Sequence, residues 1–187
     1  MRVIAGTRKS LTLKTVPGMG TRPTTDRIKE TLFNMLNPYL NGARFLDIFA
    51  GSGGIGIEAL SRGAQYCCFV EQDKRAAACI KENLIKTKFT KESDILKADA
   101  RKISIFLAEN KPYDIVFMDP PYNKGLEKEV MEALAGTDIV TEDTLFVIEA
   151  SLETDFSWID GLGLVCIKDK RYKTNKHIFL QKSSREA

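Results

Sequence analysis

Short apolar runs alternate with amphipathic stretches along most of this chain. From residue 44 onward, the apolar runs predict buried strands, and the stretches in which apolar residues recur every three or four positions predict helices. The predicted strands cover 44–49, 66–71, 94–97, 113–118 and 144–150, and the predicted helices cover 54–62, 73–87, 102–109 and 125–135. Alternation at this spacing predicts a mostly parallel sheet with helices on both faces.

The two ends of the chain have different patterns. At the start, strand-like runs at 2–6 and 11–16 predict a hairpin, and Thr24, Thr25 and Asp26 offer N-cap oxygens for a helix ending near Pro38. At the end, runs at 164–168 and 176–182 predict an antiparallel hairpin that closes the sheet. We therefore expect an α/β fold with seven strands, mostly parallel, the last one antiparallel.

The length of 187 residues suits one domain and is short for two. We expect a single domain over 1–187, in which 1–40 form an N-terminal extension of a hairpin and a helix, and 41–187 form the core.

The sequence Asp119-Pro120-Pro121-Tyr122 directly follows the fourth predicted core strand. Pro121 fixes its own φ and pushes Pro120 into an extended conformation, so the carbonyls there point in set directions. Together with the Asp119 carboxylate they can accept hydrogen bonds from an amine, and Tyr122 offers a ring to stack on. The alternative is an ordinary Asp-Pro turn after a strand.

A glycine-rich turn follows the first core strand, between residues 51 and 56. Gly51, Gly53 and Gly56 match the spacing of a dinucleotide-binding loop, and Glu71 lies 20 residues beyond Gly51. A nicotinamide dinucleotide and S-adenosylmethionine are both compatible with this loop. Asp47 inside the strand, together with the Asp119 motif, favours S-adenosylmethionine, because a cationic ligand gains from nearby carboxylates whereas a pyrophosphate gains from an open helix N-terminus.

These motifs, with Asp99 after the third core strand, resemble those of class I methyltransferases that act on exocyclic amines. The segments 1–6 and 20–34, which include Arg-Pro-Thr-Thr-Asp-Arg at 22–27, resemble the N-terminal signature of the RsmD-type 16S rRNA guanine-N2 methyltransferases. The resemblance spans nearly the whole chain and implies a Rossmann-like class I methyltransferase fold.

The resemblance also implies roles for individual residues. The methionine end of the cofactor would be held by Asp47 and the loop residues Gly51, Ser52, Gly53 and Gly56. Glu71 would accept the ribose hydroxyls, and Asp99, followed by Ala100, would receive the adenine amino group. Arg22 would meet either the cofactor carboxylate or an RNA phosphate, since a guanidinium fork suits both. Asp119, Pro120 and Tyr122 would be the catalytic residues.

Composition narrows the remaining possibilities. The chain is 43% hydrophobic and 28% charged, as in globular proteins, and it contains no apolar window long enough for a membrane span. The start of the chain lacks the apolar core of a signal peptide, so we expect a cytoplasmic protein. The cysteines show no metal-like spacing, and the single histidine, His177, lies in a strand-like run; we expect no metal and a structural role for His177.

Charge is distributed unevenly along the chain. Residues 1–36 and residues 166–187 each carry seven basic and two acidic side chains, so each end has a net charge of +5, while the whole chain has +3. If the two ends meet in space, they would form a phosphate-facing surface. The alternative is a set of solvated edge strands on which lysine discourages aggregation.

The function expected from the sequence is methyl transfer from S-adenosylmethionine to guanine N2 of 16S rRNA, free or within an assembling 30S particle, by a monomer. The choice of substrate rests on the family resemblance. Adenine N6 in RNA or DNA presents a similar amine and is the nearest alternative. A non-catalytic protein that binds the cofactor and RNA, and a nicotinamide-dependent oxidoreductase, are the others.

Overall fold

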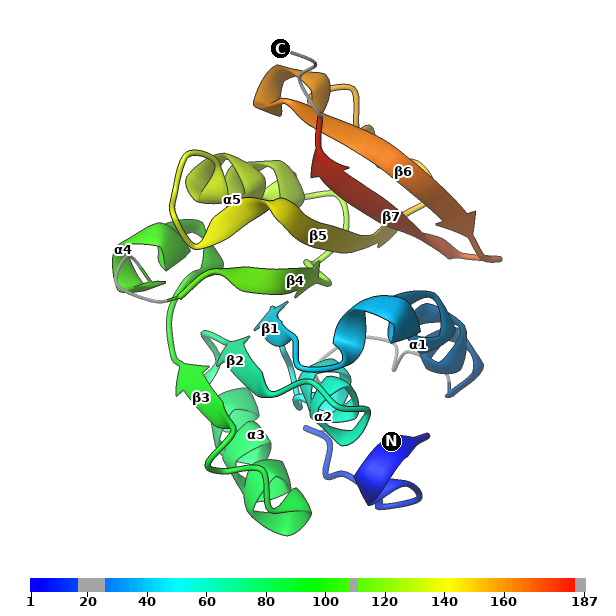
Figure 1. Cartoon of the computed structure of the whole chain (residues 1–187), viewed down its shortest axis with the longest axis vertical. Coiled ribbons are helices and arrows are strands. Elements are labelled where there is room, and N and C mark those ends of the chain that lie inside the picture. Colours follow the sequence, from blue (N-terminus) through cyan, green and yellow to red (C-terminus); the bar gives the residue numbers. More distant parts are fainter. Residues whose placement is uncertain (17–25, 108–110, 184–187) are drawn as a thin grey trace.

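The computed structural model describes residues 1–16, 26–107 and 111–183. Its centre is a seven-stranded sheet with the strand order β3-β2-β1-β4-β5-β7-β6 (Figure 1). The strands are β1 (Arg44–Ile48), β2 (Tyr66–Val70), β3 (Ser93–Leu96), β4 (Tyr113–Met118), β5 (Val140–Ser151), β6 (Leu164–Arg171) and β7 (Asn175–Lys182). The first five are mutually parallel, and β7 runs antiparallel to both β5 and β6. The predicted α/β fold with seven strands is confirmed.

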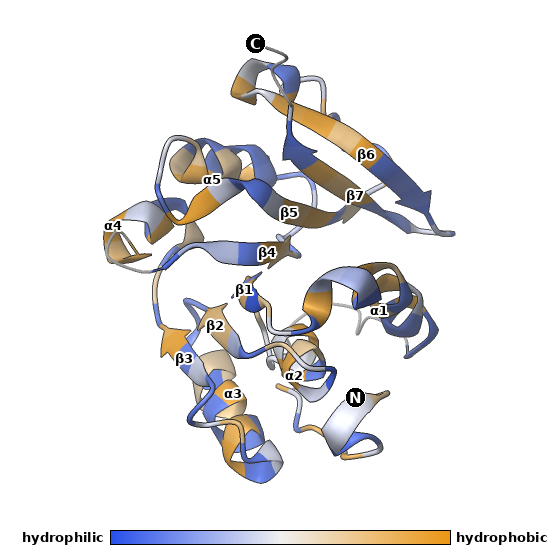
Figure 2. Cartoon of the chain, in the orientation of Figure 1, coloured by the Kyte–Doolittle hydropathy of each residue, from blue (hydrophilic) through white to orange (hydrophobic). Residues whose placement is uncertain are grey.

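Helices cover both faces of the sheet. The helices α1 (Asp26–Leu40), α2 (Gly54–Ser61) and α3 (Lys74–Thr87) pack on one face, and α4 (Ile103–Leu107) and α5 (Leu126–Leu134) pack on the other. Alternate residues along the strands supply the two cores, for example Phe117 to the first and Met118 to the second. Figure 2 shows the corresponding alternation of hydrophobic and hydrophilic residues along α3. The central strands are buried on both faces, as their continuous apolar sequences predict.

The predicted N-terminal strands, 2–6 and 11–16, are wrong in extent. A single bridge pairs Arg2 with Thr12, and a 3-10 helix, η1 (Gly6–Arg8), forms part of the connection. The ladder is short because nearby N–H groups donate to core side chains instead of to each other. Those of Ile4 and Ala5 donate to Glu58, and that of Lys14 donates to Asn83.

Several predicted boundaries also shift. The helix expected to end near Pro38 continues to Leu40, whose side chain is buried in the core and so stabilises one more turn. The helix expected at 102–109 is a 3-10 turn, η2 (Ala100–Lys102), followed by α4. Strand β5 begins at Val140 rather than at residue 144, because Val140 pairs with Tyr113 beyond a register shift in β4. Strand β6 extends to Arg171, opposite Lys176.

The two basic ends of the chain lie at opposite ends of the sheet (Figure 1). The N-terminal segment packs beside α2 and α3, whereas the C-terminal strands β6 and β7 form the far edge beyond β5. Within the described residues the basic ends therefore do not merge into one patch, and the condition attached to a shared phosphate-facing surface is not met. Within these same ranges, every helix is too short or too polar to cross a membrane.

Candidate active site

The predicted functional residues converge on one edge of the sheet. Ile48 is in register with Val70 on one side and with Met118 on the other, and Val70 is in register with Leu96. The carboxyl ends of β1 to β4 therefore lie side by side. This is the edge at which open parallel sheets bind ligands.

The glycine loop wraps the end of β1, with Asp47 beneath it. The buried Asp47 carboxylate accepts a hydrogen bond from the Gly56 N–H at 2.9 Å, inside the first turn of α2. A side chain at Gly56 would overlap Phe69 and Cys67, so glycine is required for α2 to pack on the sheet. Burial raises the pKa of Asp47 to about 7, and the nearby Glu71 carboxylate adds to the increase. The carboxyl group thus titrates near neutral pH.

Gly51 forms the open part of this loop. Its φ of +57° lies in the left-handed region, and no heavy atom lies within 4 Å of the position that a Cβ would occupy there. Gly53, also left-handed, begins α2, and the Ser52 carbonyl accepts a hydrogen bond from Asn83 of α3 at 2.9 Å. The backbone at Gly51 therefore faces free space, while the rest of the loop is anchored to the core.

Glu71 follows β2 and is held by two backbone groups. One carboxylate oxygen accepts from the Gly51 N–H at 2.8 Å, and the other accepts from the Asp73 N–H at 2.8 Å. These bonds connect the end of β2 to the glycine loop. A carboxylate has about four acceptor positions, so two remain for hydroxyl groups of a ligand.

The Asp119 motif follows β4 directly. The Asp119 N–H donates to the Ile48 carbonyl, which ties the motif to the end of β1. Burial raises the pKa of Asp119 well above its usual range, and the carboxylates of Glu149 and Asp47 raise it further. Pro120 is buried, whereas the Tyr122 side chain is 40% exposed.

Asp99 and Ala100 lie beyond β3, in the connection to α4. The Asp99 carboxylate caps η2 by accepting from the Arg101 N–H, and it also pairs with the Arg101 guanidinium at 2.6 Å. These hydrogen bonds lower the pKa of Asp99 to about 2. Asp99 is therefore already engaged as a turn residue, the role that competes with adenine binding. Arg22, the remaining predicted cofactor residue, lies outside the described residues.

A buried polar cluster beside Tyr122 was missed in the sequence. Glu149 near the end of β5 accepts hydrogen bonds from Tyr122 and Asn175, and lies 3.0 Å from the His177 Nε2. The other ring nitrogen of His177 lies 3.2 Å from the Tyr172 hydroxyl. One signal was available: antiparallel strands bring the end of 144–150 beside the start of 176–182, so Glu149 and His177 could have been paired.

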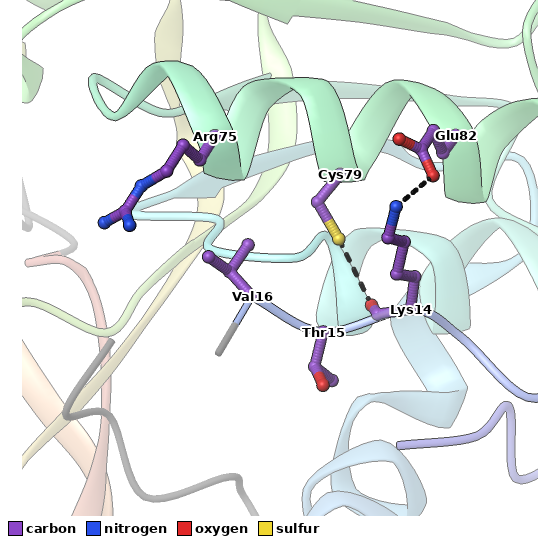
Figure 3. A pocket seen from close by; sticks show the side chains of 6 residues that line it. All are labelled: Lys14, Thr15, Val16, Arg75, Cys79 and Glu82. Atoms are coloured by element: carbon purple, nitrogen blue, oxygen red, sulfur yellow. Dashed lines mark hydrogen bonds and ion pairs between the residues drawn. The ribbon is translucent and has the colours of Figure 1, made fainter. Parts of the chain in front are cut away.

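A hollow of about 330 Å³ lies elsewhere, between the N-terminal segment and α3 (Figure 3). The Lys14 ammonium pairs with Glu82 across it at 2.7 Å, and the Cys79 thiol donates to the Lys14 carbonyl. It is lined by Lys14, Thr15, Val16, Arg75, Cys79 and Glu82, none of which is a predicted site residue. We assign it no role in the chemistry.

The residues at the carboxyl edge suit S-adenosylmethionine. The open backbone at Gly51 leaves space for a ligand, Glu71 has acceptor positions left for hydroxyl groups, and the Asp47 carboxylate would be stabilised by a cation. The fit is that of a positively charged, hydroxyl-bearing molecule.

Comparison with known proteins agrees with this geometry. The family model described as "Conserved hypothetical protein 95" matches residues 1–181. The Bacillus subtilis protein named "Putative rRNA methyltransferase YlbH" is 42% identical, covering 92% of this chain and 94% of its own. The Haemophilus influenzae "Ribosomal RNA small subunit methyltransferase D" is 37% identical over 91% of this chain and 88% of its own.

A solved structure shares the fold over its full length. The Escherichia coli "Putative methyltransferase yhhF" superposes with a TM-score of 0.86 at 30% identity, covering 99% of both chains. The resemblance stated from the sequence motifs is thereby confirmed. The chain belongs to the conserved hypothetical protein 95 family, which is that of the RsmD-type rRNA methyltransferases.

Proposed function

We propose that this protein transfers a methyl group from S-adenosylmethionine to the exocyclic N2 amine of a guanine in 16S rRNA. The observation that carries the proposal is the position of Asp119 and Pro120, which follow β4 directly beside the end of β1, where Asp47 and the glycine loop lie. An amine acceptor and a cofactor cradle thus share one edge of the sheet. The printed names of the relatives support rRNA of the small subunit as the substrate.

An exocyclic amine is a poor nucleophile, because its lone pair is delocalised into the aromatic ring. The Asp119 carboxylate and the Pro120 carbonyl would accept hydrogen bonds from the two amine hydrogens and favour a tetrahedral nitrogen. The lone pair would then point away from the ring, toward the methyl donor. Positioning of this kind can contribute on the order of 7 kcal/mol or more to lowering the barrier.

When bound, S-adenosylmethionine supplies a methyl group on a positively charged sulfur. Asp47, Gly51 and Glu71 would bind and orient that molecule at the ends of β1 and β2. As the amine attacks, positive charge develops on its nitrogen, and the adjacent Asp119 carboxylate would stabilise it. Tyr122 would stack on the target ring, which contributes about 1–3 kcal/mol in single-strand binders.

The target base must leave its helix or be unpaired already, because an amine inside a duplex cannot reach such a site. We further propose that the protein acts as a monomer in the cytoplasm, on free 16S rRNA or on an assembling 30S particle. The whole chain would form one methyltransferase domain.

The deciding experiment identifies the methylated nucleoside. The protein is incubated with a labelled methyl donor and either 30S particles or protein-free 16S rRNA, and the RNA is digested and separated by chromatography. We expect label in N2-methylguanosine. Label in N6-methyladenosine would overturn the assignment to guanine, and an absence of label in both substrates would contradict methyl transfer.

A further inference from the structure

The polar cluster around Glu149 is the most deeply buried group of titratable side chains beside the Asp119 motif in the part of the chain that the structure describes. Glu149 and Asn175 are each 5% exposed, and His177 is fully buried. Asn175 and His177 lie at the start of β7, which runs antiparallel to β5, so both face the end of β5. Two strands from the far half of the sheet thus contribute side chains to the active-site edge.

The hydrogen bonds in this cluster have one consistent direction. Asn175 donates its amide to Glu149 Oε1 at 2.6 Å, and the Tyr122 hydroxyl donates to the same oxygen at 3.1 Å. His177 Nε2 lies 3.0 Å from Oε2 and must carry a proton there, because an ionised carboxylate only accepts. Three donors therefore surround one carboxylate, which fixes its position.

Tyr122 differs from the other partners of Glu149 in its exposure. Its side chain is 40% exposed, whereas those of Asn175 and His177 are buried. Burial and the neighbouring Glu149 raise the pKa of the Tyr122 phenol, so its hydroxyl stays protonated and donates. The buried cluster thus holds the tip of an aromatic ring whose remaining surface is accessible from solvent.

We propose that Glu149 is a positioning residue that fixes the Tyr122 ring for stacking on the substrate base, with Asn175 and His177 holding the Glu149 carboxylate in place. This inference rests on the proposed function, in which Tyr122 contacts the base. It assigns the end of β5 and the start of β7 to the active site, although neither carries a cofactor or catalytic motif.

The expected effect follows from the sensitivity of catalysis to geometry. Without its hydroxyl anchor the Tyr122 ring can rotate between rotamers, and a displacement of about 1 Å at an active site can cost on the order of 100-fold in rate. The Glu149 partners do not contact the glycine loop in the described residues, so cofactor affinity should not change.

A double-mutant cycle tests the coupling, since it isolates the interaction between two side chains. Tyr122→Phe keeps the ring and removes the hydroxyl, and Glu149→Gln keeps the shape and removes the charge. We expect each variant to lower kcat by roughly 10-fold or more, and the double variant to be no slower than the slower single variant. The affinity for S-adenosylmethionine should stay within about 2-fold of wild type, in accordance with one-sided loss of base positioning.

Tyr172→Phe is the matched control. It removes a hydroxyl from the same cluster, the one beside His177 Nδ1, without touching Tyr122. We expect it to lower kcat by less than about 3-fold. If Glu149→Gln fails to fold, as judged by its melting curve, the comparison of Tyr122→Phe with Tyr172→Phe decides alone.

Two outcomes would overturn the inference. One is full activity of Tyr122→Phe, and the other is a double variant whose loss equals the product of the single losses. Both are read against an active wild-type enzyme. A wild-type protein that methylates no guanine would instead contradict the proposed function, so the two failures are distinguishable.

Discussion

The Glu58 carboxylate lies 3.1 Å from the Lys29 ammonium, and both side chains are almost completely buried. The same carboxylate accepts hydrogen bonds from the backbone of Ile4 and Ala5 and pairs with Arg62 at 2.8 Å. One acid thereby joins the N-terminal segment, α1 and α2. Burial lowers the pKa of Lys29, and the proximity of Glu58 opposes that decrease.

Replacement of Glu58 with Ala should therefore destabilise the protein. It leaves the Lys29 charge and two N–H groups without their acceptor in the interior, and breaking a buried pair in this way costs about 3–5 kcal/mol. Urea denaturation would measure the loss. Glu82→Ala is the control, because it removes an exposed pair with Lys14 and should cost less than about 1 kcal/mol. Equal losses in the two variants would contradict the central role of Glu58.

Cofactor affinity should depend on pH through Asp47. Its pKa of about 7 means that the carboxyl group is mostly protonated below pH 7 in the free protein, whereas a bound cation favours the ionised form. Binding then releases a proton, so affinity should rise by up to about 10-fold per pH unit from pH 5 to 7 and level off above it.

Calorimetric titration across this pH range measures the effect, with two buffers of different ionisation enthalpy to count the protons. Asp47→Asn keeps an acceptor for the Gly56 N–H and should bind with a weaker, pH-independent affinity. An unchanged slope in this variant would show that another group titrates.

The rate should respond to pH through Asp119. Its pKa is raised, so the carboxylate forms only as the pH increases through that raised value, and the carboxylate is the stronger acceptor for amine hydrogens. We expect kcat/KM to increase with pH above neutrality in the wild type. Asp119→Asn should lack this rise, and Asp119→Ala should lose about 100-fold or more in kcat. Full activity of the alanine variant would remove Asp119 from the mechanism.

A methyl group on the glycine loop should block the cofactor. Gly51→Ala introduces a Cβ into the free space beside Gly51 and also places alanine at positive φ, which costs about 1 kcal/mol of stability. We expect a loss of at least about 10-fold in affinity for S-adenosylmethionine.

Gly136→Ala provides the control for backbone strain. Its φ of +77° and open surroundings are similar, but it lies between α5 and β5 at the opposite edge of the sheet. It should lose about the same stability as Gly51→Ala while binding the cofactor normally. If Gly51→Ala also bound normally, the loop would not be the binding site that we propose.

Local pattern alone determined the alternation of strands and helices, since burial of strands and helix faces is encoded in the spacing of neighbouring apolar residues. It also located Asp47, Glu71 and the Asp119 motif at one edge, because every parallel strand ends on the same side. The pairing of the N-terminal runs failed, because Glu58 and Asn83 compete for the backbone groups that a hairpin would have used.

Only the tertiary structure decided which buried charges meet. Lys29 with Glu58 and His177 with Glu149 are separated by 29 and 28 positions, and nothing in the local sequence around either carboxylate marks its partner. Such pairs depend on helix packing and on the register of β5 with β7. Since an unpaired charge in the interior is costly, the folded chain brings together side chains whose sequence neighbourhoods give no sign of the contact.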